Sequence, residues 1–158
     1  MAQNIAPEVL DYIAGQKVLT LATTAVDGPW AATLTYVNEG PTIYVWMHTS
    51  SATAKRIGES PRVAFAIDNY SEDWRQTKGV QGGGECEPVT GEEIARVAAM
   101  FGDKYPELRP GSTSAVVFYA IEPKVLEFID NTRGVDEKSD FGAVYRRESA
   151  FDLPALDG

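Results

Sequence analysis

Residues 42–63 run TIYVWMHTSSATAKRIGESPRV, and this stretch decides the fold. Its first part, Thr42–Met47, combines β-branched and aromatic residues and predicts a strand. Hydroxyl residues follow from Thr49, and we expect a short helix over residues 49–59. Pro61 ends the helical pattern, and the alternating residues 62–68 predict the next strand. A strand, a short helix and a second strand therefore follow one another directly.

The hydroxyl residues at the start of this helix have two interpretations. A helix N-terminus has free backbone N–H groups and the positive end of the helix dipole, so it can bind a phosphate. Alternatively, Thr49, Ser50 or Ser51 simply caps the helix. The sequence leaves both interpretations open.

Most of the chain predicts strands joined by short turns. Helical spacing of apolar residues predicts helices at residues 7–15 and 90–105. Further strands are expected at residues 17–25, 30–37, 78–89, 115–121 and 125–129. Such connections favour an antiparallel barrel over a parallel sheet, so we expect a mainly β barrel with flanking helices. The barrel domain would cover residues 1–130, and residues 131–158 would form a tail that is flexible or packs on a partner.

Three consecutive glycines, Gly82 to Gly84, interrupt the predicted strand 78–89. They indicate a bulge or a close approach of the backbone to something bound, and an irregular loop is the alternative.

Composition restricts the classes of function. The 158 residues are 44% hydrophobic and carry a net charge of −9, which argues against nucleic acid or an anionic membrane as the main partner. No apolar run approaches the roughly 20 residues needed to span a bilayer, and Cys86 is the only cysteine. We therefore expect a cytoplasmic protein. His48 is the only histidine and has no paired metal-ligand spacing with Cys86, so no metal site is expected.

The sequence resembles the pyridoxamine 5'-phosphate oxidase-like FMN-binding split-barrel family over about Val9 to Lys138. The segments that carry the likeness are residues 20–23 before Asp27-Gly28-Pro29, residues 45–63, residues 78–81 and residues 128–131. The last two are most similar to the small uncharacterised branch of the family. The resemblance implies a six-stranded antiparallel split barrel that forms a homodimer, with one flavin mononucleotide (FMN) at each of two sites in the subunit interface.

The resemblance also implies which residues hold the FMN. The residues along the isoalloxazine ring would be Ala32, Thr33, Leu34 and Thr35, and Trp46, Met47 and His48 would lie beside the ligand. The phosphate would be faced by Ser50, Ser51 and Thr53, and Gln81 would extend toward the ligand from strand 78–89. The oxidase itself has basic phosphate-binding residues at positions that align here with uncharged Ala32, Ala52 and Thr53. Arg56, Lys78 or Arg75 would have to supply that charge, or the phosphate site is weakened. Alternatively, Lys55 and Arg56 form a solvated helix face.

The C-terminal Arg-x-His motif of the oxidase is missing, since His48 is the only histidine, so vitamin B6 oxidation is not expected. An FMN-dependent oxidoreductase with a small-molecule redox substrate fits the residues, because the flavin carries the chemistry and no catalytic constellation is recognisable. The alternative is a non-catalytic module that stores or senses flavin or haem, with His48 as the available axial ligand. Nothing in the sequence selects a deazaflavin or nicotinamide partner.

Overall fold

The computed structural model describes residues 5–108, 115–133 and 144–146 of the chain. The α-helices are α1 (Pro7–Gly15), α2 (Ala52–Glu59) and α3 (Glu93–Lys104), and two short 3₁₀ helices are η1 (Trp74–Gln76) and η2 (Asn131–Arg133). The strands are β1 (Val18–Ala25), β2 (Gly28–Glu39), β3 (Thr42–His48), β4 (Arg62–Asp68), β5 (Lys78–Pro88), β6 (Val116–Asp130) and β7 (Val144–Arg146).

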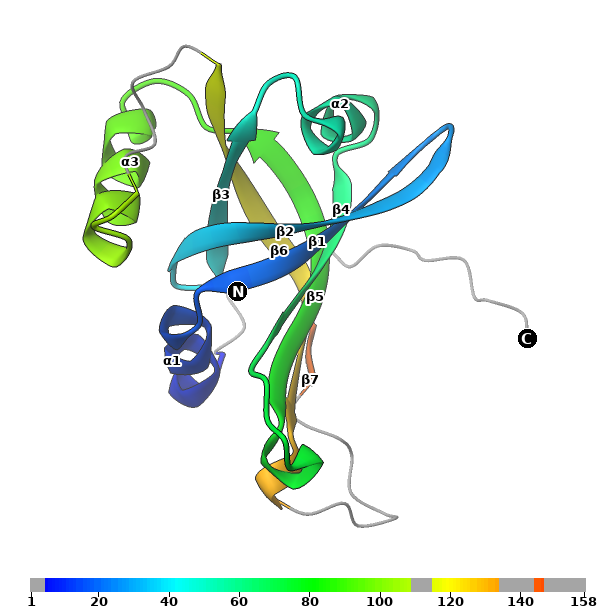
Figure 1. Ribbon diagram of the computed structural model, residues 1–158, viewed down its shortest axis with the longest axis vertical. Coiled ribbons are helices and arrows are strands. Elements are labelled where there is room, and N and C mark those ends of the chain that lie inside the picture. Colours follow the sequence, from blue (N-terminus) through cyan, green and yellow to red (C-terminus); the bar gives the residue numbers. More distant parts are fainter. Residues whose placement is uncertain (1–4, 109–114, 134–143, 147–158) are drawn as a thin grey trace.

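All strand pairs are antiparallel and form one sheet in the order β3-β2-β1-β4-β5-β6-β7 (Figure 1). Hydrogen bonding between β3 and β6 closes β1 to β6 into a barrel. The short connections β1–β2 and β2–β3 are hairpins, as the turn residues predict. The expectation of a mainly β protein built on a six-stranded antiparallel split barrel is confirmed.

One strand prediction was wrong. Residues 115–121 and 125–129 were expected to form two strands, but β6 runs without a break from Val116 to Asp130. The register shifts where Gly83 pairs with Val125 and Gly84 pairs with Pro123, which leaves one extra residue, Lys124, on β6. A proline is tolerated inside a strand at such a bulge, because the ladder hydrogen bond that it cannot donate is already interrupted there.

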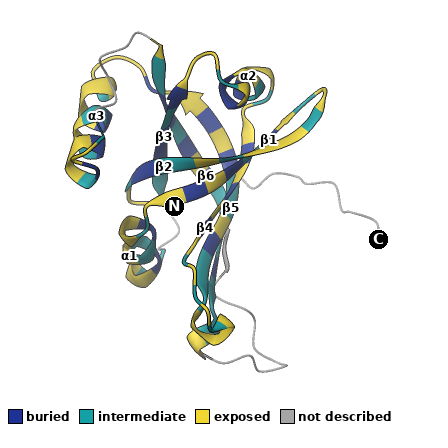
Figure 2. Ribbon diagram, in the orientation of Figure 1, coloured by how far each residue is buried: buried dark blue, intermediate teal, exposed yellow. Residues whose placement is uncertain are grey.

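Two apolar clusters hold the barrel and its helices together (Figure 2). The larger fills the barrel with inward side chains of the strands and is closed by apolar residues of α1 and α2, such as Ile13 and Ile57. The smaller lies outside the barrel, where Val97 and Phe101 of α3 pack against Tyr44 and Phe118. Burial of these faces accounts for the position of each helix.

The predicted tail lies mostly outside the described residues. Residues 144–146 form β7, which pairs with residues 125–127 of β6. The prediction that the tail is flexible or packs on a partner is not tested by the described part. Within that part, no helix has the length and hydropathy required to cross a membrane.

Candidate functional site

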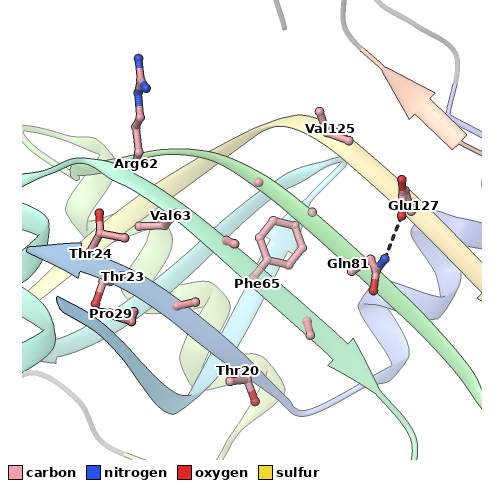
Figure 3. Close-up of a pocket in the computed structure, with 15 residues that line it drawn as sticks. Thr20, Thr23, Thr24, Pro29, Arg62, Val63, Phe65, Gln81, Val125 and Glu127 are labelled. Carbon is pink, nitrogen blue, oxygen red and sulfur yellow. Dashed lines mark hydrogen bonds between the residues drawn. The ribbon is translucent and has the colours of Figure 1, made fainter. Parts of the chain in front are cut away.

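A groove of about 760 Å³ lies on the outer face of the sheet, across β1, β4, β5 and β6 (Figure 3). Side chains alternate between the two faces of a strand, so the strand pairing places outward residues in rows. One row contains Thr20, Ala66 and Gln81, and the next contains Ala22, Ala64 and Gly83. The inward neighbours Val63 and Phe65 belong to the core. The floor of the groove is therefore flat, since its side chains are small.

Polar groups flank this floor. The Gln81 side-chain amide donates a 2.8 Å hydrogen bond to the Glu127 carboxylate, and Arg62 projects from the sheet elsewhere in the groove (Figure 3). A flat apolar surface edged by a few polar side chains suits a planar, partly polar ring system.

The three glycines of β5 differ in what surrounds them. A Cβ on Gly82 would lie 2.6 Å from the Val125 carbonyl oxygen, and one on Gly84 would lie 2.0 Å from the Glu122 carbonyl oxygen. A Cβ on Gly83 would meet only the Val63 carbonyl oxygen, at 3.5 Å. The register shift between Gly83 and Gly84 confirms the bulge interpretation. Packing beside this bulge requires glycine at positions 82 and 84. At Gly83 the added carbon would stand in the groove.

A second group of sequence-predicted residues lies where β2 and β3 meet and α2 begins. The Trp46 indole N–H donates a 3.1 Å hydrogen bond to the Thr35 hydroxyl, and the His48 ring lies edge-on to Trp46 with centroids 6.4 Å apart. His48 and Ser50 are exposed. The Ser51 hydroxyl accepts a 3.1 Å hydrogen bond from the Ala54 N–H, so Ser51 is the N-cap of α2.

Other predicted residues point away from the outer face. Met47 and Thr53 are buried, with 4% and 5% of their surface exposed, and Met47 belongs to the barrel core. Leu34 packs against that core, and Ala32 is paired with the buried Leu21. Of the residues expected along the ring, Thr33 and Thr35 are therefore the ones whose side chains lie on the outer face, and Ala32 and Leu34 can offer only backbone groups there.

The three candidate cations do not gather at the start of α2. Arg75 forms a 2.9 Å ion pair with Asp73 beside η1, and Lys78 begins β5, at the end of the barrel opposite α2 (Figure 1). Arg56 is on α2, but its guanidinium forms a 3.0 Å ion pair with Asp27 and lies 5.0 Å from the ring centroid of Trp30.

Sequence reasoning missed the groove floor. The sequence contains one weak indication of this floor. In β4, alanine occupies two successive outward positions, Ala64 and Ala66, where an exposed strand face usually carries polar side chains. Both alanines are exposed. A continuous exposed apolar surface of this kind is typical of a ligand-binding or interaction surface.

The Cys86 thiol and the Lys104 ammonium are titratable groups that lie away from the groove. Burial, with a smaller contribution from Glu87, raises the pKa of the Cys86 thiol to about 12, which keeps it protonated and unreactive. Burial and the nearby Lys17 lower the pKa of Lys104 to about 8. The Lys104 ammonium lies 4.2 Å from the ring centroid of Tyr36 and has no hydrogen-bond partner among the described residues.

Residues 6–128 match the family model described as pyridoxamine 5'-phosphate oxidase. A UPF0306 protein from Photorhabdus laumondii is 30% identical over 131 residues, which cover 80% of this chain and 88% of the relative. A heme-binding protein from Mycobacterium smegmatis has a TM-score of 0.71 at 21% identity, covering 84% of this chain, which spans 58% of that protein. An FAD-binding protein from Mesorhizobium loti has a TM-score of 0.61 at 19% identity, covering 77% and 92% of the two chains. The two structural likenesses establish the shared fold.

Proposed function

Because this chain belongs to the pyridoxamine 5'-phosphate oxidase family, we propose that it binds FMN and acts as an oxidoreductase on a small-molecule substrate other than pyridoxamine phosphate. The observation that carries the proposal is the outer groove, whose flat floor includes a glycine that internal packing does not require. A methyl group at Gly83 would occupy the place where a ring lies against Ala64 and Ala22. The residues present therefore fit a flavin ring.

We further propose that two copies of the chain share each site. Three strand spacings, about 14 Å at ~4.8 Å each, separate Thr33 from Gln81 along the sheet, and Trp46 lies one strand beyond Thr33. The groove is also open to solvent, whereas a cofactor site normally buries most of its ligand. A second copy laid over the outer face would cover the ring and bring its own Gln81 to the residues around Trp46.

In this proposal the chain contributes binding and exclusion of water. Bound FMN supplies the electron or hydride transfer. Thr33 and Thr35 offer hydroxyls to the polar edge of the ring, and Gln81 offers an amide. Ser50 and the first N–H groups of α2 face the phosphate. The protonated Cys86 thiol lies inside the barrel and takes no part.

The test is a titration of the purified protein with FMN, followed by visible absorbance and by quenching of flavin fluorescence. Saturable binding of one FMN per chain supports the proposal. The Gly83→Leu variant fills the groove and should lose binding, whereas Val26→Leu, at a fully exposed position on the β1–β2 turn, should retain it. Absence of binding to the wild-type protein would refute the proposal.

Haem is the second candidate, because the exposed His48 lies at the end of β3 beside Trp46, where an imidazole can ligate iron. The Mycobacterium smegmatis protein of the same fold binds haem. A Soret band that appears on adding haemin and disappears in His48→Ala would favour haem. FMN binding that persists in His48→Ala, without a His48-dependent haem spectrum, would favour flavin.

A further inference from the structure

The hairpin between β1 and β2 extends beyond the barrel and lies beside α2 (Figure 1). Its turn is formed by Val26 and Asp27, between the ends of β1 and β2. Arg56 bridges these two elements, because it belongs to α2 and its guanidinium contacts the hairpin twice. It pairs with Asp27 at 3.0 Å and lies over the Trp30 ring, 5.0 Å from the centroid.

This contact is partly withdrawn from water. The Arg56 side chain is 13% exposed, and its Nε atom is buried without a hydrogen-bond partner in the described part of the chain. The Asp27 carboxylate is 71% exposed, so the ion pair alone contributes little, but a largely buried guanidinium that also stacks on an indole is constrained more than an arginine in a fully exposed pair. The guanidinium is therefore held on the hairpin and is not extended toward the capped start of α2.

The hairpin also carries part of the groove. Thr24 and Pro29, on either side of its turn, line the groove, and Ser51 caps α2 at the end where the phosphate is proposed to lie. Arg56 thus ties the edge of the ring-binding floor to the helix that faces the phosphate.

We propose that Arg56 is a positioning residue of the flavin site, which fixes the β1–β2 hairpin on α2 and does not itself contact the phosphate. The inference rests on the proposed FMN function. It assigns a role to the one basic residue of α2 that is withdrawn from solvent.

The test compares Arg56→Gln, Asp27→Asn and the double variant in titrations with FMN and with riboflavin, which lacks the phosphate. Both single variants should weaken FMN and riboflavin alike, Arg56→Gln by about tenfold and Asp27→Asn by a smaller factor, because Asp27→Asn removes the ion pair and leaves Arg56 over the Trp30 ring. The double variant should be no weaker than Arg56→Gln, because Arg56→Gln already removes both contacts. Arg96→Gln is the matched control. Arg96 also pairs with carboxylates, Glu39 and Glu93, and also lies over a ring, that of Tyr44, but it belongs to α3.

A different pattern would overturn the proposal. If Arg56 binds the phosphate, Arg56→Gln weakens FMN but not riboflavin, and Asp27→Asn leaves FMN affinity unchanged or raises it. Hydrogen exchange of the free protein provides a readout that needs no flavin. Amides of residues 25–28 and of Trp30 should exchange faster in Arg56→Gln and Asp27→Asn than in Arg96→Gln, and equal rates would overturn the proposal. A wild-type protein that binds neither flavin would refute the FMN function, while the exchange rates would still show whether Arg56 holds the hairpin.

Discussion

Alanine at two adjacent glycines of β5 should have opposite consequences. None of the β5 glycines has a positive φ, so their backbone conformations suit any L-residue and only space decides the outcome. In Gly82→Ala the new Cβ would lie 2.6 Å from the Val125 carbonyl oxygen, 2.8 Å from Phe65 Cζ and 2.9 Å from Leu126 Cδ2. In Gly83→Ala its nearest neighbour is the Val63 carbonyl oxygen, at 3.5 Å, which is an ordinary contact.

The expected change in the free energy of unfolding depends on which neighbouring atoms must move to accommodate the new methyl group. Two side chains of the core and one carbonyl of the β5–β6 ladder have to shift for Gly82→Ala, and overpacking of this kind costs about 1–3 kcal/mol. For a chain of this size that lowers Tm by about 2–4 °C per kcal/mol, so a loss of roughly 4–8 °C is expected for a cost of about 2 kcal/mol. Gly83→Ala restricts the unfolded chain without a clash, so its free energy of unfolding should be unchanged or higher by up to about 1 kcal/mol.

Thermal and urea unfolding followed by circular dichroism measure both variants, and FMN titration gives the second readout. Gly83→Ala should bind FMN more weakly than the wild type although its fold is intact, because its methyl group enters the groove. A Gly83→Ala protein destabilised as much as Gly82→Ala, or a Gly82→Ala protein with wild-type stability, would show that the assignment of the two glycines to opposite faces is wrong.

Two further substitutions test the energetics of the helices. The fold lowers the pKa of Lys104 from its ordinary value of 10.5 to about 8, so the folded state binds this proton less tightly than the unfolded chain does. The free energy of unfolding should therefore rise as the pH increases from about 8 toward 10.5. Because the Lys104 side chain is only half-buried, we expect this gain in the free energy of unfolding to be about 1–2 kcal/mol. It is measured by urea unfolding of the wild type and of Lys104→Met at each pH. A free-energy difference between the two proteins that stays constant across this pH range would contradict the prediction. Ser51→Ala removes the hydroxyl that accepts from the Ala54 N–H and should cost about 1 kcal/mol of unfolding free energy, whereas Ser50→Ala, at an exposed neighbour, should cost little; equal losses would mean that Ser51 is not the cap.

Much of the barrel could be predicted because its determinants are local. The alternation of Val63, Phe65 and Ile67 with other residues gave β4 its bounds, and turn residues located the hairpins. The continuity of β6 could not be predicted locally. Pro123 breaks a strand in isolation, and only the partner strand, with Gly84 opposite the proline, provides the bulge that accommodates it.

The site was harder to predict because it depends on which face each strand turns outward. A family resemblance assigns a binding role to a whole segment, such as residues 32–35, but in a pleated strand the alternate side chains of that segment lie on opposite faces of the sheet. The orientation of the Arg56 side chain could not be predicted either, because its partners Asp27 and Trp30 are distant from it in the sequence. The alanines of β4 have no chemistry of their own, so they become informative only once the neighbouring strands show that a continuous flat surface surrounds them.

Whether two chains share each site can be decided by complementation. Ser50→Glu places a negative charge where the phosphate is proposed to lie, and Gln81→Ala removes the amide proposed to come from the other copy; both positions are exposed, so folding should survive. Each variant alone should bind FMN poorly. When the two are refolded together, about half of the dimers are mixed, and each mixed dimer has one site with both changes and one with neither, so about a quarter of all sites regain wild-type affinity. If both residues acted within one chain, every site would keep one defect and mixing would restore nothing, which would refute the shared site.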